Sequence, residues 1–371
     1  MSRVLVLNCG SSSVKWRRYD GDRVLDQGTV ERVGEPGGGP ADHTSAVRQI
    51  LAGQDLSGLA AVGHRVVHGG RTFSAPVLVD DAVLAAIRDL VPLAPLHNPA
   101  NLAGIEMARE TLPDVPQVAV FDTAFHHTLP EAAATYAIDR DTAERYAIRR
   151  YGFHGTSHAY VSRRTAELLG RPYGQLNTIT LHLGNGASAC AVADGRSVAT
   201  SMGMSPLQGL VMGTRSGDLD PAVIFHLRRE AGLSVDEIDD LLNHHSGLLG
   251  LTGVNDMREV LQRRAAGDQA AELAFDVYCR RITGYVGAYY ALLGRVDAIT
   301  FTAGVGEHAA PVRAAALAGL DRLGIVVDPT RNAGNGDRVI SPEGTEVTVC
   351  VIRTDEEREI ARQARAVVEA G

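Results

Sequence analysis

The sequence carries one strand–loop–strand pattern twice, once at its beginning and once near its middle. The first copy runs from the apolar segment 4–7 through a Gly-Ser loop into the segment 14–16. The second runs from 178–183 through the small residues 184–188 into an apolar segment that ends at a turn, Asp194-Gly195. Small residues at the tip and an Asp-Gly turn after the second strand are typical of β-hairpins. Two such hairpins predict two related domains.

The remaining pattern predicts the fold class. A third Gly-rich segment, 302–307, follows the apolar segment 298–301 and precedes a helical stretch at 309–320. Elsewhere helical periodicity alternates with short apolar strands, which is typical of α/β proteins whose helices cover a sheet. Further helices are predicted at 80–90, 98–110, 159–169, 222–230, 236–242 and 268–294. With 371 residues, the chain is long for one core and sufficient for two domains.

Lys15 closes the first Gly-Ser loop and is the only lysine in the chain. Lysine and arginine total 36, so every other member of this group is arginine. An ammonium on a thin stem approaches phosphate oxygens as a point charge, whereas a guanidinium is a wide planar fork. The loop lacks the Gly-Lys-Ser/Thr sequence of a P-loop. It therefore predicts phosphate binding by a different fold, with a solvated hairpin lysine as the alternative.

Composition excludes several classes of protein. The net charge of −8, without a basic tract, argues against nucleic acid as a partner. No apolar run approaches the ~18 residues of a membrane span, and no signal-peptide core follows the N-terminus. The cysteines form no C-x-x-C pair, which predicts neither a zinc site nor a disulfide framework: Cys9, Cys190, Cys279 and Cys350. We expect a cytoplasmic globular protein with no membrane or nucleic-acid partner.

Two arginines are candidates for anion binding. Arg65 lies between an apolar strand and a Gly-Gly turn, and Arg215 lies in a Gly-rich loop. An arginine is most often a solvated surface residue, but an unpaired guanidinium among apolar residues and glycines would be destabilising. Phosphoryl transfer between two anions requires such positive charge. The residues alone leave both interpretations open.

Acidic residues occur at two points where chemistry is expected. Asp122 follows the apolar segment 118–121, and active-site carboxylates of α/β proteins gather at the carboxyl ends of strands. Capping of the next segment is an equally good explanation. Thr354 and Glu357 predict a capping box at the start of the last helix. Capping leaves the neighbouring Glu356 unexplained.

His154 and His158 are four residues apart, which invites comparison with zinc metalloproteases. The metalloprotease motif needs a glutamate beside the first histidine, on a helix. Here Gly-Thr-Ser separates the two histidines. The segment therefore predicts a loop or the start of a helix, and no zinc site.

Nine motifs, in order along nearly the whole chain, resemble those of the acetate kinase family, within the acetate and sugar kinase, Hsp70 and actin superfamily. They lie at 8–15, 63–70, 93–99, 121–126, 150–158, 182–188, 212–221, 246–253 and 301–307. The resemblance implies two duplicated ribonuclease H-like (actin-like ATPase) domains with a cleft between them, one at 1–124 with 355–371 and the other at 125–354. It implies a homodimer built on the second domain. It also implies reversible, direct in-line phosphoryl transfer from ATP to acetate, giving ADP and acetyl phosphate.

The resemblance also implies roles for individual residues. It implies catalytic roles for Asp122, Arg65, Arg215, His154 and His97. It implies nucleotide binding by Lys15, Ser11, Ser13, His182, Leu183, Gly184, Asn185, Gly186, Asp256, Met257, Arg258, Gly304, Val305 and Gly306. Acetate would bind Arg65 and a small apolar niche formed by Val67, Leu96 and Pro206. Mg²⁺, with Mn²⁺ as a substitute, would be held by Asn8 and Glu356.

Two alternatives come from different classes: a propionate or butyrate kinase of the same family, and a non-enzymatic nucleotide switch like actin or Hsp70. A sugar kinase should carry a carboxylate base for its hydroxyl acceptor, for which two loop arginines are a poor substitute. The chain departs from the family pattern in a shorter segment between Lys15 and Arg65, and at Arg71, Met257 and His308. These departures bear on substrate breadth and nucleotide preference, because none removes a residue with an implied catalytic role.

Overall fold

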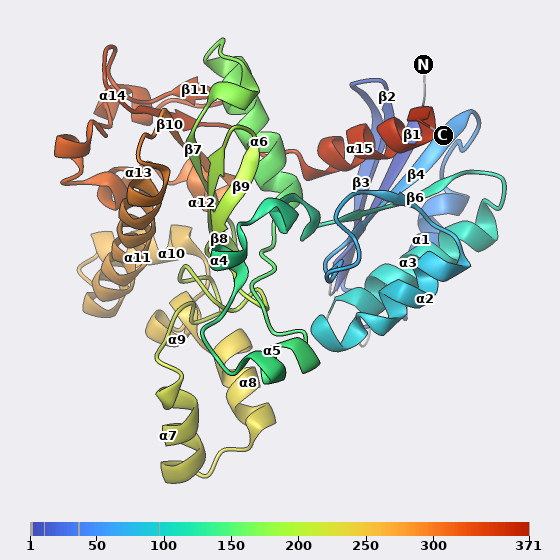
Figure 1. Cartoon of the computed structure of the whole chain (residues 1–371), viewed down its shortest axis with the longest axis horizontal. Coiled ribbons are helices and arrows are strands. Elements are labelled where there is room, and N and C mark those ends of the chain that lie inside the picture. Colours follow the sequence, from blue (N-terminus) through green and yellow to red (C-terminus); the bar gives the residue numbers. More distant parts are fainter. Residues whose placement is uncertain (1–2, 11, 36–37, 96, 371) are drawn as a thin grey trace. The chain divides into compact units, whose positions relative to one another are not determined.

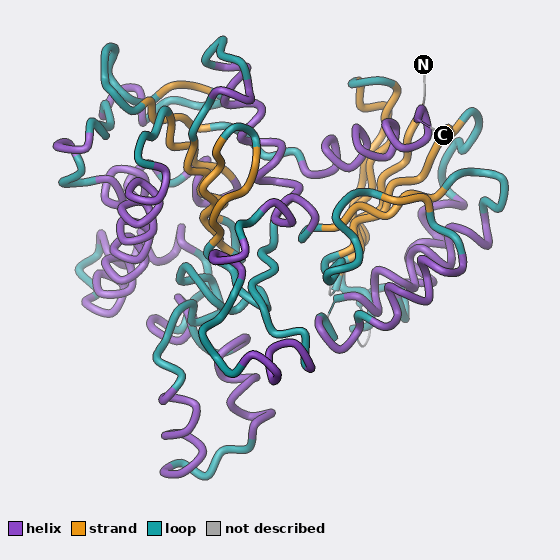
Figure 2. The backbone as a smooth tube through the Cα atoms, viewed as in Figure 1, coloured by secondary structure: helices purple, strands orange, loops and turns teal. Residues whose placement is uncertain are grey.

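The computed structural model describes residues 3–10, 12–35, 38–95 and 97–370. The chain divides into two compact units. Unit 1 consists of Met1–His127, Gly155–Ser157 and Asp355–Gly371, and unit 2 consists of Thr128–His154 and His158–Thr354. Each unit contains one six-stranded mixed sheet flanked by helices (Figure 1, Figure 2).

The sheet of unit 1 has the strand order β3-β2-β1-β4-β6-β5. Its strands are β1 (Arg3–Cys9), β2 (Ser13–Asp20), β3 (Arg23–Glu31), β4 (Leu59–Val66), β5 (Val77–Leu78) and β6 (Gln117–Phe121). Strands β1, β4 and β6 are parallel, and β2, β3 and β5 are each antiparallel to the strand beside them. The β1–β2 hairpin sets Asn8 opposite Lys15, which confirms the first predicted hairpin.

Helices cover both faces of this sheet: α1 (His43–Ala52), α2 (Asp81–Asp89), α3 (Asn98–Thr111) and α15 (Glu356–Ala370). Successive strand side chains point to opposite faces. Leu5 and Leu7 of β1 therefore pack with α1 and α3, while Val4 and Val6 pack with α15. A Cβ on Gly63 would lie 2.9 Å from Cγ2 of Ile360, so α15 packs directly on β4.

The sheet of unit 2 has the order β11-β12-β10-β7-β8-β9. Its strands are β7 (Thr178–Leu183), β8 (Ala187–Ala193), β9 (Arg196–Thr200), β10 (Ala298–Thr302), β11 (Arg338–Val339) and β12 (Thr348–Val351). A hairpin again precedes two parallel strands, and β11 closes the opposite edge in antiparallel pairing. Strand for strand this is the topology of unit 1. The predicted α/β class and the predicted duplication are both confirmed.

The helices from 131 to 332 are α4 (Glu131–Ala134), α5 (Arg140–Arg145), α6 (Gly155–Leu168), α7 (Ala222–Glu230), α8 (Val235–His244), α9 (Gly247–Thr252), α10 (Met257–Ala265), α11 (Gln269–Leu293), α12 (Ala303–His308), α13 (Ala310–Leu317) and α14 (Pro329–Asn332). Short 3₁₀ helices lie at η1 (Val91–Leu93), η2 (Ala124–Thr128), η3 (Tyr173–Gln175) and η4 (Asp321–Leu323). No helix in the described part of the chain is long and apolar enough to cross a membrane.

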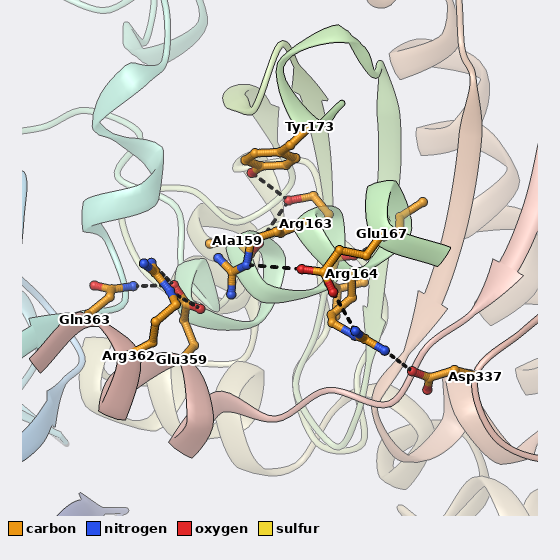
Figure 3. A network of polar contacts seen from close by, with 12 residues as sticks. Ala159, Arg163, Arg164, Glu167, Tyr173, Asp337, Glu359, Arg362 and Gln363 are labelled. Carbon is orange, nitrogen blue, oxygen red and sulfur yellow. Dashed lines mark hydrogen bonds and ion pairs between the residues drawn. The ribbon is translucent and has the colours of Figure 1, made fainter. Parts of the chain in front are cut away.

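Polar contacts fix α6 within unit 2. The guanidinium of Arg164 donates to Glu167 on the same helix and to Asp337 before β11, at 2.5 and 3.3 Å (Figure 3). Two residues before Arg164, the hydroxyl of Ser162 lies 3.0 Å from that of Tyr173. These contacts join α6, which begins just after His154, to the residue before β11 and to η3.

Three predicted helix boundaries are wrong. The helix predicted at 159–169 begins four residues earlier, at Gly155. The stretch predicted as one helix at 309–320 ends at Leu317, because Gly319 takes a positive φ of 78°. The predicted capping box of Thr354 and Glu357 does not form. Asp355 directly precedes α15, and its Oδ1 accepts the Arg358 N–H at 3.0 Å. Asp355 therefore holds the capping position, and Glu357 makes a different contact, described below.

Candidate active site

The carboxyl ends of β1, β4 and β6 bring three predicted residues together in unit 1. Arg65 is the penultimate residue of β4, and its Nε and Nη2 donate to the carboxylate of Asp122 at 3.0 and 2.6 Å. Its Nη1 donates to Oδ1 of Asn8 at 3.2 Å. Burial opposes the charge of Arg65, but the carboxylates of Asp122, Glu356 and Glu357 together outweigh it and raise the pKa of Arg65. Parallel strands gather their ends at one edge of a sheet, which explains this meeting.

Glu356 is the first residue of α15 and lies near the same cluster. Burial is the main cause that raises its pKa to about 7, and the carboxylates of Asp122 and Glu357 act in the same direction. The charges of Arg65 and Lys15 act against them. The cluster therefore contains a carboxyl group whose ionisation is opposed by its surroundings and would be favoured by an added cation.

Sequence reasoning missed two members of this cluster. Nδ2 of Asn8 donates to Oε1 of Glu357 at 3.2 Å, so this side chain bridges Glu357 and Arg65. Arg17 of β2 donates to Oδ1 of Asp355 at 2.7 Å and thereby holds the start of α15. The capping pattern offered a sufficient explanation for Glu357, so its contact with Asn8 was not predicted. No motif or local pattern in the sequence distinguishes Arg17 from the other arginines.

The other predicted residues of the first hairpin are described in part. Lys15 is exposed, and its positive charge acts to lower the pKa of Glu356. The carbonyl of Ser13 accepts the Gly10 N–H at 2.7 Å, which closes the loop. Ser11, a predicted nucleotide-binding residue, lies outside the described residues.

The loop after β4 carries the predicted acyl-binding residue Val67, which is buried. Two buried asparagines of α3 hold this loop: Oδ1 of Asn101 accepts the Val67 N–H at 3.0 Å, and Asn98 exchanges hydrogen bonds with the backbone of His68. Sequence reasoning treated both asparagines as ordinary helix residues. His97 directly precedes α3 and is half-buried. Leu96 lies outside the described residues.

Four predicted residues of unit 2 come together at the tip of the second hairpin. His154 precedes α6 with a left-handed φ of 55°. Its ring stacks on that of His182, with centroids 4.2 Å apart. A Cβ on Gly186 would lie 3.5 Å from both Nε2 of His154 and Nη1 of Arg215. The absence of a side chain at Gly186 thus leaves the imidazole and the guanidinium facing one small space.

Arg215 is half-buried, and burial lowers its pKa. Its Nη1 contacts the carbonyl of Pro206 at 3.4 Å and Sδ of Met212 at 3.8 Å. Among the residues that the structure describes, no acidic side chain forms an ion pair with Arg215. An unpaired, partly desolvated guanidinium is destabilising unless an anion completes it. The site therefore suits an anionic ligand.

A pocket of about 470 Å³ lies within unit 2 beside this hairpin. Seven of the predicted nucleotide-binding residues line it: Gly184, Asn185, Asp256, Met257, Arg258, Gly304 and Val305. Asp256 also caps α10 and pairs with Arg258. The predicted His182, Leu183, Gly186 and Gly306 are not among its lining residues, although His182 contacts His154 as described. A groove in unit 1, of about 550 Å³, holds none of the predicted residues.

Close packing shapes the pocket wall. A Cβ on Gly213 would lie 2.0 Å from Oδ1 of Asn185, which only glycine avoids. The Gly213 N–H donates to the carbonyl of Asn185 at 2.8 Å. The hairpin tip is therefore locked to the loop that carries Arg215.

The oxygen donors of Asn8 and Glu356 decide whether the cluster in unit 1 can hold a metal ion. No group of three or more His, Cys, Asp or Glu side chains in the described residues is arranged to hold a metal ion. Mg²⁺ commonly binds through one or two carboxylates while substrate phosphates and waters supply the rest. Asn8 and Glu356 offer an amide oxygen and a carboxylate, and burial together with the carboxylates of Asp122 and Glu357 raises the pKa of Glu356, so that a bound cation would favour its ionised form. The residues fit a magnesium ion carried by a phosphate ligand.

Comparison with known proteins gives consistent matches. The model of the acetokinase family matches residues 3–362. An acetate kinase of Streptomyces avermitilis is 59% identical, covering 99% of this chain and 98% of its own. A crystal structure of Porphyromonas gingivalis acetate kinase has a TM-score of 0.94 at 43% identity, covering 99% and 100% of the two chains. A propionate kinase from Francisella tularensis has a TM-score of 0.93 at 40% identity, with the same coverage.

Proposed function

The chain belongs to the acetokinase family, and on that premise we propose that it transfers a phosphoryl group reversibly from ATP to acetate, giving ADP and acetyl phosphate. The observation that carries the proposal is the guanidinium of Arg215. It has no acidic partner among the described residues and shares the space at Gly186 with His154. A cation and a hydrogen-bonding imidazole at one point suit a transferring phosphoryl group.

The acceptor is proposed to be a carboxylate, because a carboxylate needs no general base and the Asp122 carboxylate is not available as one. Both oxygens of Asp122 accept hydrogen bonds from Arg65, so this carboxylate is engaged in an ion pair. A sugar hydroxyl would need a base to remove its proton. Acetate is already ionised at neutral pH and attacks the γ-phosphorus directly, without a covalent enzyme intermediate.

We assign the following parts to the residues. Arg65 and Arg215 bind the acyl carboxylate and the transferring phosphoryl group, His154 donates a hydrogen bond to that group, and Asp122 orients Arg65. His97 assists at the periphery. The methyl group of acetate lies against Val67, Leu96 and Pro206.

The nucleotide is proposed to occupy the 470 Å³ pocket, with its phosphates toward the hairpin tip that carries Gly186. Lys15 is proposed to bind the nucleotide as well. Asn8 and Glu356 would hold Mg²⁺, or Mn²⁺ in its place, through bound water. The metal would neutralise charge on the phosphates.

A homodimer built on unit 2 is also proposed. α7 exposes Val223, Ile224 and Phe225, by 39%, 36% and 57%. An exposed apolar cluster of this kind is typical of a protein–protein contact. Light scattering of the purified protein tests this; a monomer at micromolar concentration would exclude it.

Trapping with hydroxylamine tests the reaction. Purified protein is incubated with ATP, Mg²⁺, acetate and hydroxylamine, and acetyl hydroxamate accumulates only if acetyl phosphate forms. Omission of acetate is the control. Consumption of ATP without hydroxamate, or equal consumption without acetate, would show a nucleotide switch or a different acceptor instead.

A further inference from the structure

A buried chain of hydrogen bonds lies behind His154 in unit 2. The Ser188 hydroxyl lies 2.9 Å from Nδ1 of His154 and 2.8 Å from Nε2 of His158. The other ring nitrogen of His158, Nδ1, lies 2.7 Å from the hydroxyl of Thr180. Ser188, His158 and Thr180 are fully buried, whereas His154 is half-buried. The chain therefore runs from the interior of the sheet to the ring proposed to meet the phosphoryl group.

The number of hydrogens restricts how this chain can be arranged. A serine hydroxyl has one hydrogen, so between two ring nitrogens it donates to one and accepts from the other. A neutral imidazole likewise has one N–H and one bare nitrogen. With both rings neutral, the tautomer of His154 is therefore coupled to that of His158. Only two directions of donation along the chain remain.

In one direction the Thr180 hydroxyl donates to Nδ1 of His158, Nε2–H of His158 donates to Ser188, and the Ser188 hydroxyl donates to Nδ1 of His154. In the other direction every bond is reversed, and the Thr180 hydroxyl must donate elsewhere. Its other contact is the carbonyl of Cys190 at 3.5 Å. That distance exceeds the usual range for an O–H···O bond, whereas the 2.7 Å contact with His158 lies within it. The geometry favours the first direction.

We propose that Ser188, supported by His158 and Thr180, is a positioning residue that holds neutral His154 in the tautomer with its hydrogen on Nε2. This inference rests on the proposed phosphoryl transfer. Nδ1 of His154 then accepts from Ser188, and Nε2–H is the donor on the side of Gly186 and Arg215. His154 can donate to a phosphoryl oxygen without first gaining a proton.

The ring also has a fixed direction. Ser188 holds Nδ1 from behind, and His182 stacks against the face of the ring. Ser188 is itself paired with His182 across the β7–β8 ladder. The two strands therefore position the Ser188 hydroxyl and the His182 ring, and these two groups orient the ring of His154. A wrong or unrestrained histidine tautomer lowers turnover strongly where the ring must donate from one nitrogen.

Nitrogen NMR of ¹⁵N-histidine-labelled protein tests the tautomer directly, without any need for activity. The expected result is a bare Nδ1 and a protonated Nε2 for His154 in the wild-type protein near neutral pH, assigned by comparison with His154→Gln. A predominant Nδ1–H form would overturn the proposal.

Kinetics of three variants test the coupling. We expect Ser188→Ala to lower kcat about 10- to 100-fold, with little change in KM for ATP, because bound nucleotide contacts other residues. Thr180→Val removes the donor at the far end of the chain, three hydrogen bonds away from His154, and should both lower kcat and increase the Nδ1–H form of His154. Thr180→Ser keeps the hydroxyl and should restore both readouts.

Ser197→Ala is the matched control, because Ser197 is buried in the same sheet and its hydroxyl contacts Cys190 Sγ at 3.3 Å. It measures the general effect of losing a buried hydroxyl there, and its kcat should remain near wild type. Equal losses of kcat in Ser188→Ala and Ser197→Ala, or a loss without any change of tautomer in Thr180→Val, would overturn the positioning role. A wild-type protein that forms no acyl phosphate but shows the expected tautomer would refute the proposed function and leave the hydrogen-bond assignment standing.

Discussion

Arg65 and Arg215 present the same group in opposite settings. Arg65 has a buried carboxylate partner in Asp122, while Arg215 has none among the described residues and depends on backbone and sulfur contacts. Sequence reasoning identified both arginines but could not separate these settings. The partner of Arg65 is 57 residues away in sequence, and this ion pair forms because the ends of β4 and β6 meet.

Replacement of Arg215 by lysine should lower kcat by about 10²- to 10³-fold without unfolding the protein. An ammonium cannot reproduce the two-pronged hydrogen bonding of a guanidinium to phosphoryl oxygens. Stability should be nearly unchanged because no carboxylate loses a partner. The measurement is steady-state hydroxamate formation, with circular dichroism to check the fold. Arg171→Lys, which alters an exposed ion pair with Asp297, is the control, and near-normal turnover of Arg215→Lys would refute the assignment.

Val67 bears on the choice of acyl group. We expect propionate to be used more slowly than acetate, and Val67→Ala to narrow the difference in kcat/KM. One methylene in an apolar niche changes discrimination by about 1–3 kcal/mol, so the preference is real but incomplete. Val66→Ala is the control, since Val66 packs in the core with Phe73 and Phe121. An unchanged acetate-to-propionate ratio in Val67→Ala would place that side chain outside the niche.

His64 should make stability depend on pH. It is buried in β4, its Nε2 lies 2.8 Å from Oε1 of Gln117, and burial lowers its pKa from 6.5 to about 4. As the pH falls below 6.5, the unfolded chain binds a proton that the folded chain excludes. Stability is therefore full above pH 6.5 and decreases toward pH 4, by up to about 3 kcal/mol.

Urea unfolding between pH 4 and 7.5 measures this dependence. His64→Gln replaces the ring N–H by an amide N–H donor that does not titrate, and should flatten the decrease in that window. His226→Gln alters an exposed histidine and should leave it unchanged. If His64→Gln keeps the full decrease, other groups are responsible for it.

At the scale of elements, local patterns predicted most of the structure. The two hairpins, the strand before α12 and helices such as α7 and α11 were predicted because their periodicity and turn residues are local signals. The start of α15 was wrong because Thr354 and Asp355 are both good caps, and the choice depends on Arg17, far away in sequence. Asn98, Asn101 and Ser188 were missed for the same reason: their function lies in contacts between elements.

Removal of the α15 cap should affect both stability and metal use. Asp355 caps the helix and accepts the Arg17 hydrogen bond, so Asp355→Ala should destabilise the protein by about 1–2 kcal/mol. The first turn then frays and displaces Glu356, so more Mg²⁺ should be needed for half-maximal activity. Urea unfolding and Mg²⁺ titration measure the two effects.

Asp42→Ala is the matched control for this change. Asp42 caps α1 through the Ser45 N–H at 2.7 Å and has no contact with the acidic cluster. It should be destabilising without changing the Mg²⁺ dependence. The same shift in Mg²⁺ dependence for both variants would mean that general destabilisation, and not Glu356, sets it.

At the scale of the molecule, the two sheets share one topology, and we propose that units 1 and 2 are the two duplicated domains. Each sheet places a hairpin beside two parallel strands and closes with a short antiparallel edge strand. Unit 1 gathers Asn8, Arg65 and Asp122 at the ends of its parallel strands. Unit 2 gathers His154 and Arg215 around its hairpin tip. The same scaffold thus carries two different sets of polar groups.

The register of the two hairpins shows at which positions the polar groups of the two units differ. One residue before the end of its first strand, each hairpin carries a cross-strand pair: Asn8 with Lys15 in one and His182 with Ser188 in the other. The apolar strand residues behind each pair lie in the core, whereas the pair itself is at the strand end. Selection could therefore change the tips independently in each copy while the inherited framework stayed intact, and a mutational library for altered phosphate or nucleotide binding belongs at these tips rather than in the sheets.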